Sequence, residues 1–291
     1  MHQANNILLN ALTIDVEDWF HPEWVRGHVD GHLVEKRALM AILPILGLLD
    51  RYRVKATFFI LGDVAKECPD VLLKIYKEGH EIGSHGMSHR MLDDLGEEEF
   101  RKELEDFRSL RREILGDVEI KGFRAPTFSL HQKTKWALPI LRDFGYHYDA
   151  SLFPIKFFGN RLYGVHQAPR FPYRICFDNP SEEDPSSNFW EFPAAVVSLG
   201  GFRIPVGGGF YLRALPLCFL RWALKRINRE GPFNIYLHPW ECDIHTPRLP
   251  LPFISKWVTY YRVNRTIFKL EELLKHFSFS RVEDVLRIYQ R

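Results

Sequence analysis

The chain has 291 residues, of which 46% are hydrophobic and 14% aromatic, enough apolar side chain for one large buried core. Its 39 Lys and Arg nearly balance its 37 Asp and Glu, so nothing in the charge indicates a nucleic-acid partner. The four cysteines form no CxxC pair, which argues against both a disulfide scaffold and a thiolate zinc site.

The beginning of the sequence lacks the basic region and long apolar run of a secretory signal, and no uncharged apolar run approaches the roughly 20 residues of a membrane span. We therefore expect a cytoplasmic protein. Residues 215–227 (LPLCFLRWALKRI) carry cations along an apolar sequence. A helix packed on the core is the simpler interpretation, but a peripheral helix on the inner membrane surface stays open.

Up to about residue 155, short β-rich segments alternate with amphipathic helical ones. Strands are expected at 6–18 (NILLNALTIDVED), 54–61 (VKATFFIL), 80–85 (HEIGSH), 120–126 (IKGFRAP) and 146–151 (YHYDAS). Helices are expected at 37–53, 69–79, 97–115 and 134–145. Strict alternation implies parallel strands with right-handed crossovers. We expect an irregular (β/α) barrel of about seven strands rather than a flat doubly wound sheet, because no GxGxxG motif opens a helix.

After residue 155 the alternation loosens around a polar loop at 178–188. Strands are expected at 189–197 and 202–206 and in 233–243 (FNIYLHPWECD), followed by helices at 265–279 and 282–289. VGGGF at 206–210 lacks the GK[ST] of a phosphate-binding loop, so we expect a tight turn or rim loop. The predicted division is a barrel over residues 1–245 and a helical extension over 246–291.

Polar side chains stand at the ends of the predicted strands. They are Asp15, Glu17, Asp18, His85, His89, Arg124, Asp149, Ser151 and His238. Each alone has an ordinary structural explanation, such as a solvated loop, an ion pair or a buried histidine. Parallel strands in a barrel place their carboxyl ends on one rim, so together these residues predict a site there.

The segment GHEIGSHGMSH contains His85 and His89, four residues apart. If the two lie in a helical turn, they share a face and can bind one divalent ion together with a carboxylate. Two histidines, one carboxylate and an open position suit a hydrolytic metal centre.

With these motifs the chain resembles the polysaccharide deacetylases of the NodB-homology type. TIDVED resembles their acidic motif, GHEIGSHGMSH their histidine motif and FRAP their Arg-x-Pro motif, while YDAS and LHP resemble their last two. The resemblance spans roughly residues 10–240 in family order and implies an irregular barrel. DVEDWFH and the C-terminal extension resemble a subgroup tied to exopolysaccharide or capsule synthesis.

The resemblance implies hydrolysis of an N-acetyl group from an amino sugar. Asp15 is then the general base, His238 the acid that protonates the leaving amine, and Arg124 the group that orients Asp15. His85 and His89 hold a divalent metal, zinc first, with cobalt, iron and manganese as alternatives. The substrate is a polysaccharide or its lipid- or nucleotide-linked precursor, and no oligomeric state follows.

Two assignments stay open in the sequence. Many relatives have adjacent aspartates on the first strand, whereas Val16 follows Asp15 here, so either Glu17 or Asp18 supplies the metal carboxylate. Strand alternation favours Glu17, and Asp149 is the next candidate. Asp149 is also a candidate substrate-binding residue. Trp19, Phe128, Phe210 and Tyr211 are candidate sugar-stacking side chains, although core packing is the simpler explanation for them.

Two rival functions remain. Similar barrels hydrolyse other C–N bonds, such as formyl groups on lipid-linked sugars and ureide rings. A non-catalytic sugar-binding or scaffold protein is the second, and the joint presence of Asp15, the histidine pair, Arg124 and His238 argues against it.

Overall fold

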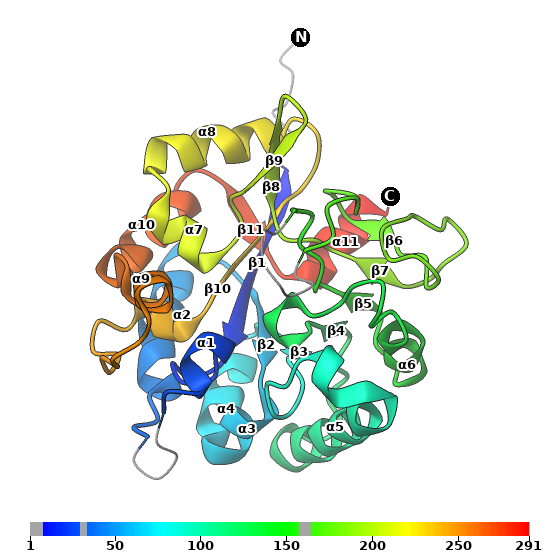
Figure 1. Ribbon diagram of the computed structural model, residues 1–291, viewed down its shortest axis with the longest axis horizontal. Helices are drawn as coiled ribbons and strands as arrows, with labels where there is room; N and C mark the ends of the chain where they lie inside the picture. Colours follow the sequence, from blue (N-terminus) through cyan, green and yellow to red (C-terminus); the bar gives the residue numbers. More distant parts are fainter. Residues whose placement is uncertain (1–7, 30–33, 157–163, 291) are drawn as a thin grey trace.

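The computed structural model describes residues 8–29, 34–156 and 164–290; the first seven residues, which bear on the expected absence of a secretory signal, lie outside this part. Its centre is a curled, mainly parallel sheet (Figure 1). The strands are β1 (Leu9–Val16), β2 (Thr57–Ile60), β3 (Glu81–Ser84), β4 (Gly122–Phe123), β5 (Tyr148–Asp149), β6 (Tyr173–Arg174), β7 (Trp190–Glu191), β10 (Asn234–Leu237) and β11 (Ser278–Ser280). A separate hairpin consists of β8 (Val196–Leu199) and β9 (Phe202–Pro205).

Seven strands run parallel in the order β10-β1-β2-β3-β4-β5-β7, and β6 follows as an antiparallel edge. At one end of this path, β10 forms backbone hydrogen bonds with the segments that follow β7 and β9 instead of with a second strand of the sheet. Ala195 N–H donates to the carbonyl of Asn234 at 3.0 Å, and Tyr236 N–H donates to that of Gly207 at 2.7 Å. The expected irregular barrel of about seven strands is confirmed, in the form of a half-barrel.

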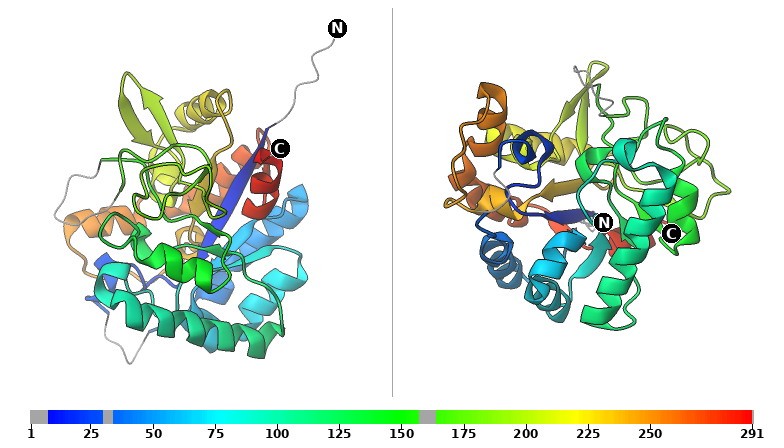
Figure 2. Two further views of the ribbon diagram at one scale, coloured as in Figure 1. Left: turned by 90° about the vertical axis from the view of Figure 1, so that its right-hand side faces the viewer. Right: turned by 60° about the horizontal axis from the view of Figure 1, so that its bottom comes forward.

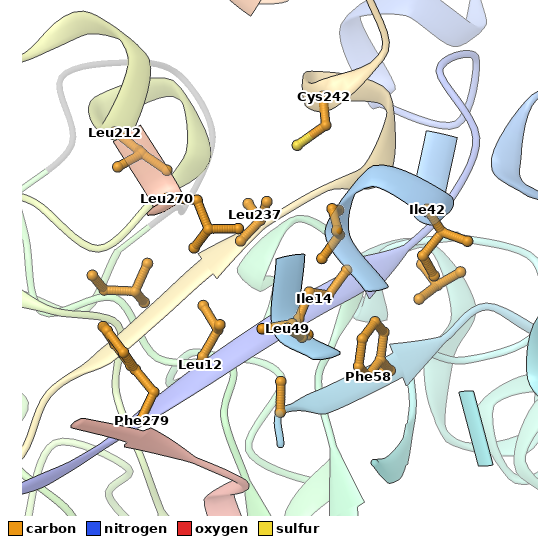
Figure 3. Packing of buried hydrophobic residues seen from close by; sticks show 14 of the residues in the cluster. Leu12, Ile14, Ile42, Leu49, Phe58, Leu212, Leu237, Cys242, Leu270 and Phe279 are labelled. Carbon is orange, nitrogen blue, oxygen red and sulfur yellow. The ribbon is translucent and has the colours of Figure 1, made fainter. Parts of the chain in front are cut away.

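Strand β1 is buried on both faces, as expected for a central parallel strand. Leu12, Ile14 and Val16 point outward into the main apolar core (Figure 3). The alternate residues Ala11, Thr13 and Asp15 therefore face the barrel interior. Because side chains alternate along the strand, the apolar ones pack under the helices, and Asp15 faces the barrel interior near the carboxyl end of β1.

Helices cover the outside of the sheet (Figure 2). They are α1 (Glu23–Arg26), α2 (Ala38–Tyr52), α3 (Gly62–Glu67), α4 (Pro69–Lys77), α5 (Leu92–Leu115), α6 (Ala137–Asp143), α7 (Gly209–Ala214), α8 (Leu217–Ile227), α9 (Phe253–Tyr260), α10 (Thr266–Leu274) and α11 (Val282–Tyr289). The short 3₁₀ helices are η1 (Pro126–Phe128), η2 (Pro239–Cys242) and η3 (Val263–Arg265). Helix α8 packs Leu220, Ala223, Leu224 and Ile227 into the core, so the simpler interpretation of 215–227 holds for that face. In the described part of the chain, no helix combines the length and apolarity needed to cross a membrane.

The C-terminal region is not purely helical. The predicted helix 265–279 ends at Leu274, and Ser278–Ser280 forms β11, which pairs in parallel with Leu9–Ala11 of β1. The expectation fails there because an available strand edge outweighs local helical propensity. Helix α11 then inserts Val282, Val285 and Leu286 among interior side chains such as Phe59 and Tyr148. The division at residue 245 stays a prediction.

Helix α11 gives a stability prediction. Leu286→Ala should lower the free energy of unfolding by about 2–5 kcal/mol, since Leu286 is 5% exposed against the barrel interior. Ile288→Ala is the matched control: on the same helix but 54% exposed, it should change the value by no more than about 0.5 kcal/mol. Urea denaturation of both variants measures the difference. Equal effects would show that α11 does not pack as described.

Candidate active site

A cavity of about 840 Å³ opens at the carboxyl ends of the strands. Its lining includes Asp15, Glu17, His85, His89 and His238. The structure therefore brings together five of the polar residues that the sequence placed at strand ends. The cavity also reaches residues of α1, α5, α7 and α9 that lie outside the motifs.

The histidine pair converges through a loop. His85 directly follows β3, and residues 85–91 form no helix; the expected helical turn is wrong. Gly86 has φ +74° and His89 φ +58°, so the chain reverses tightly and brings the rings to a centroid distance of 5.3 Å. Glycine adopts positive φ more readily than residues with a Cβ, so Gly86 suits this turn.

Glu17, and not Asp18, joins the histidines. Glu17 is 2% exposed, and its Oε2 contacts Nε2 of His89. Asp18 turns the other way: its Oδ2 accepts hydrogen bonds from the backbone N–H groups of Arg37 at 2.7 Å and Ala38 at 3.0 Å. Asp18 thus supplies acceptors to the N-terminus of α2, where helical N–H groups lack partners.

Glu17, His85 and His89 fit a divalent cation. One ligand atom from each lies within 4.8 Å of the others, and all three residues are buried. Glu17 Oε2 accepts no well-formed hydrogen bond from the residues described. His85 Nδ1 lies 2.8 Å from the carbonyl of Arg124, so it donates its proton there and leaves the Nε2 lone pair for a metal. Burial lowers the pKa of His85 to about 4, which favours the neutral, ligating form.

Asp15 is paired with Arg124 in the barrel interior. The Arg124 guanidinium, 0% exposed, donates from Nη1 to Asp15 Oδ1 at 2.6 Å and to Thr13 Oγ1 at 2.9 Å. Its Nε donates to the carbonyl of Ala150 at 2.8 Å, and the ring of Phe59 lies 4.4 Å from its Cζ. Asp15 Oδ2 is turned the other way and lies 3.9 Å from His238 Nε2.

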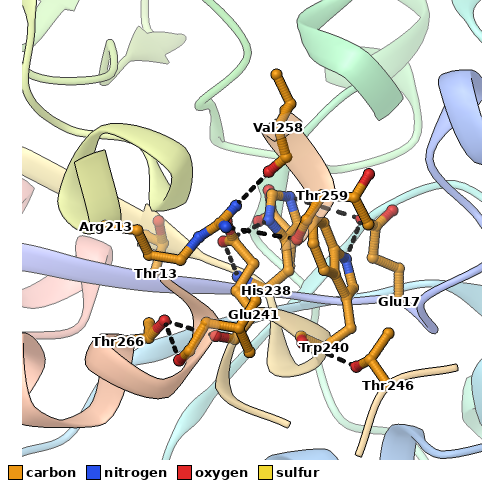
Figure 4. A network of polar contacts seen from close by, with 12 residues as sticks. Thr13, Glu17, Arg213, His238, Trp240, Glu241, Thr246, Val258, Thr259 and Thr266 are labelled. Carbon is orange, nitrogen blue, oxygen red and sulfur yellow. Dashed lines mark hydrogen bonds and ion pairs between the residues drawn. The ribbon is translucent and has the colours of Figure 1, made fainter. Parts of the chain in front are cut away.

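His238 contacts a second buried ion pair, Arg213–Glu241, which the motif analysis missed (Figure 4). Glu241 Oε2 lies 2.9 Å from His238 Nδ1, and Glu241 Oε1 accepts from Arg213 Nη2 at 2.7 Å and Nε at 3.0 Å. Burial by itself raises the pKa of Glu241, but Arg213 and His238 outweigh it and lower the pKa to about 2. Burial likewise lowers the pKa of His238, whereas Glu17, Glu241 and Asp15 raise it to about 9.

The glycines of VGGGF make room for this pair. A Cβ on Gly209 would lie 1.6 Å from Glu241 Oε2, and one on Gly208 would lie 2.5 Å from the Tyr236 hydroxyl oxygen. Gly209 also begins α7, the helix that carries Arg213. The expected turn or rim loop is therefore a close-packed helix start behind His238.

Asp149 does not reach the cavity. It is 0% exposed, and its Oδ1 accepts from the Ser151 hydroxyl at 2.6 Å. Burial raises the pKa of Asp149, and burial together with Asp149 raises the pKa of the neighbouring Glu191 well above the usual range. Two buried carboxyls side by side are favourable when they share a proton. Among the described residues, Glu191 Oε2 has no hydrogen-bond partner. A proton on Glu191 would let this carboxyl donate a hydrogen bond to the neighbouring Asp149.

The candidate aromatic residues divide into two groups. Trp19 is 3% exposed, donates from Nε1 to the carbonyl of Glu35 and packs with Val25 and Trp240, outside the cavity lining. Phe128, Phe210 and Tyr211 do line the cavity. The sequence analysis missed Trp24 and Trp240, which line it too. Trp240 Nε1 donates to Glu17 Oε1 at 3.0 Å, and its place two residues after His238 is the only local signal for it.

Comparison with known proteins gives two adjoining family matches. Residues 41–148 match the polysaccharide deacetylase family, and residues 150–287 match a domain of unknown function, DUF3473. A peptidoglycan-N-acetylglucosamine deacetylase of Bacillus cereus is 36% identical over 94 residues, which cover 32% of this chain and 34% of that protein. Residues 41–148 thus match the family that the motifs resemble, and the matched part spans only about a third of this relative.

Solved structures show the same fold over the whole chain. A protein from Mycobacterium smegmatis assigned as a polysaccharide deacetylase superimposes with a TM-score of 0.63 at 18% identity, covering 100% of this chain and 93% of that one. An allantoinase superimposes with a TM-score of 0.61 at 15% identity, covering 98% and 91%. At these identities the likeness concerns the fold, which is shared by enzymes of different substrates.

The two carboxylates after β1 give a matched pair of variants. Glu17→Gln should lower the metal content of the purified protein, because it removes an anionic ligand oxygen. Asp18→Asn should keep the metal and change stability little, because Asn caps the N-terminus of a helix about as well as Asp. Elemental analysis and thermal unfolding of both variants check this. Metal loss in Asp18→Asn alone would reverse the assignment.

The Asp149–Glu191 pair predicts a pH dependence of stability. Because both pKa values are raised in the folded state, the folded protein keeps a proton that the unfolded chain releases above the ordinary Glu pKa of 4.5. The free energy of unfolding should therefore fall as pH rises above this value, by at most about 1.4 kcal/mol per pH unit for one proton. Glu191→Gln should flatten the slope in urea titrations between pH 5 and pH 8. An unchanged slope would mean that no proton is shared.

Proposed function

We propose that this protein is a metal-dependent hydrolase that removes the N-acetyl group from an amino sugar. The observation that carries the proposal is the meeting of a metal-fitting triad, an arginine-held aspartate and a glutamate-held histidine in one cavity. The match of residues 41–148 to the polysaccharide deacetylase family and the activity in the name of the Bacillus cereus relative support it.

Asp15 is the proposed general base, which accepts a proton from the attacking water. Arg124 acts as a positioning residue: it binds Oδ1 and leaves Oδ2 turned toward the cavity. A charge-assisted hydrogen bond from a buried guanidinium also favours the ionised carboxylate that a base requires.

Glu17, His85 and His89 are the proposed ligands of the metal, with zinc as the first expectation. When bound, such an ion polarises the acetyl carbonyl and lowers the pKa of water. The nearby Trp240 N–H fixes the other oxygen of Glu17, so that Oε2 points toward the histidines.

His238 is the proposed acid. Water adds its oxygen to the acetyl carbon, the C–N bond breaks, and His238 Nε2 delivers a proton to the departing sugar nitrogen, which gives acetate and a free amine. Glu241 holds Nδ1 and so orients the ring with Nε2 toward Asp15 and Glu17. Arg213 and Glu241 are positioning residues in this scheme.

The proposed substrate is an N-acetylated amino sugar in a polysaccharide, or in its lipid- or nucleotide-linked precursor, with exopolysaccharide synthesis as the setting. Cavity-lining rings such as Phe210, Tyr211 and Trp24 support a sugar-sized ligand. The cytoplasmic location stays a prediction.

Acetate release from N-acetylglucosamine oligomers, measured with metal content, tests the function. Asp15→Asn should retain the metal and lose about 10²–10⁴-fold in kcat, the usual contribution of a general base. Loss of metal in this variant would exchange the roles of Asp15 and Glu17. Formylated amino sugars and a ureide belong in the same screen: preferential hydrolysis of either would favour the rival C–N hydrolase, and no hydrolysis with bound metal would favour the binding protein.

A further inference from the structure

The segment around α9 has an unusual charge composition. Between Asp243 and Glu271 the chain contains no acidic residue but five basic ones, Arg248, Lys256, Arg262, Arg265 and Lys269. The first four are exposed. Lys269 is buried, and its Nζ donates to backbone carbonyls in α7 and just after it. The outer side of this segment is thus uniformly cationic.

The same helix exposes large apolar side chains. Phe253 is 84% exposed, Ile254 72% and Trp257 46%. Their spacing of i, i+1 and i+4 places them on one side of α9, which we call the α9 apolar face. Contiguous apolar side chains at such exposures mark an interaction site, since water contact with them is unfavourable.

Cations are held beside this face. Lys256 lies on α9 itself, the Arg248 guanidinium lies 4.4 Å from the ring centre of Tyr260, and that of Arg262 lies 5.1 Å from the ring centre of Tyr261. These contacts fix two positive charges near the C-terminal end of the helix. Aromatic and aliphatic side chains with flanking Lys and Arg are typical of helices that lie in the interface of an anionic membrane.

The α9 apolar face is firmly attached next to the active-site cavity. Ile254, Ser255 and Val258 line that cavity, and Arg213 donates hydrogen bonds to the carbonyls of Val258 at 2.8 Å and Tyr261 at 2.6 Å. Trp24 of α1 donates to Thr259 Oγ1 at 2.9 Å. Figure 1 shows α9 and α1 on the same side of the barrel. A surface bound to this face therefore lies at the edge of the cavity.

We propose that the α9 apolar face, with Arg248, Lys256 and Arg262, docks on an anionic lipid bilayer and presents the cavity to its surface. A protein partner or a second copy of the chain would also account for the exposed apolar side chains of α9. The absence of any acid from 244 to 270 disfavours a second copy of the same face, because like charges would meet there, and the exposed apolar side chains beside these cations favour a surface that is both anionic and apolar within, as a bilayer is.

Vesicle sedimentation tests the proposal. The full chain is mixed with vesicles of phosphatidylcholine, or of phosphatidylcholine with phosphatidylglycerol. We expect binding to the anionic vesicles that is at least tenfold stronger than to neutral ones. Binding should weaken with added salt, because the Debye length falls from about 10 Å at 0.1 M to about 3 Å at 1 M. No substrate is present, so the outcome is independent of the proposed deacetylation.

Three double variants make the test specific to α9. Phe253→Ser with Ile254→Ser should reduce binding to anionic vesicles at least tenfold, and Lys256→Glu with Arg262→Glu should abolish the preference for anionic lipid. Ile288→Ser with Tyr289→Ser removes exposed side chains from α11, at the other end of the barrel, and should bind as wild type. Wild-type binding by the first two variants, or no binding by the parent chain, would overturn the proposal. Self-association that the first variant abolishes, without vesicle binding, would assign the face to a second copy.

Discussion

The site depends on the buried ion pair between the Arg124 guanidinium and Asp15. The Arg124 side chain binds Thr13 and Asp15 of β1 and the carbonyl after β5, while its own carbonyl fixes His85 after β3. A single residue thus sets the positions of the proposed base and of one proposed metal ligand. Truncating one partner of a buried ion pair leaves the other charge unpaired, at a cost of about 3–5 kcal/mol, so geometry and stability are coupled here.

A second buried pair, Arg213–Glu241, repeats this arrangement on the other side of the cavity. Glu241 holds His238, and Arg213 also holds the end of α9. Both residues lie in the part of the chain that matches DUF3473, whereas the histidine pair and Arg124 lie in the part that matches the deacetylase model. Both matched regions therefore contribute to one cavity, together with Asp15 and Glu17, which precede them. Helix α9, where we propose membrane docking, is hydrogen-bonded to Arg213, which is paired with the Glu241 that holds the proposed acid His238.

The C-terminal residues close the other end of the barrel. β11 extends the sheet beside the first half of β1, and the N-terminus of α11 is bound by Thr57 and Glu81, whose side chains accept from Val282 N–H at 2.8 Å and Glu283 N–H at 3.2 Å. These contacts lie at the amino ends of the strands, away from the cavity. The C-terminal residues thus stabilise the barrel from the end of the sheet opposite the cavity.

Periodicity and motif order, read along the chain, predicted the irregular barrel of parallel strands, the resemblance to the polysaccharide deacetylases and the convergence of Asp15, His85, His89 and His238 on one cavity. Tertiary structure decided the rest. Glu17 and Asp18 are neighbours of the same charge, and only the position of α2 turns Asp18 away from the histidines. Glu241 and Arg213 lie 28 residues apart and meet through packing of α7 against η2. Residues 278–280 become a strand because the edge of β1, distant in sequence, is there to pair with them.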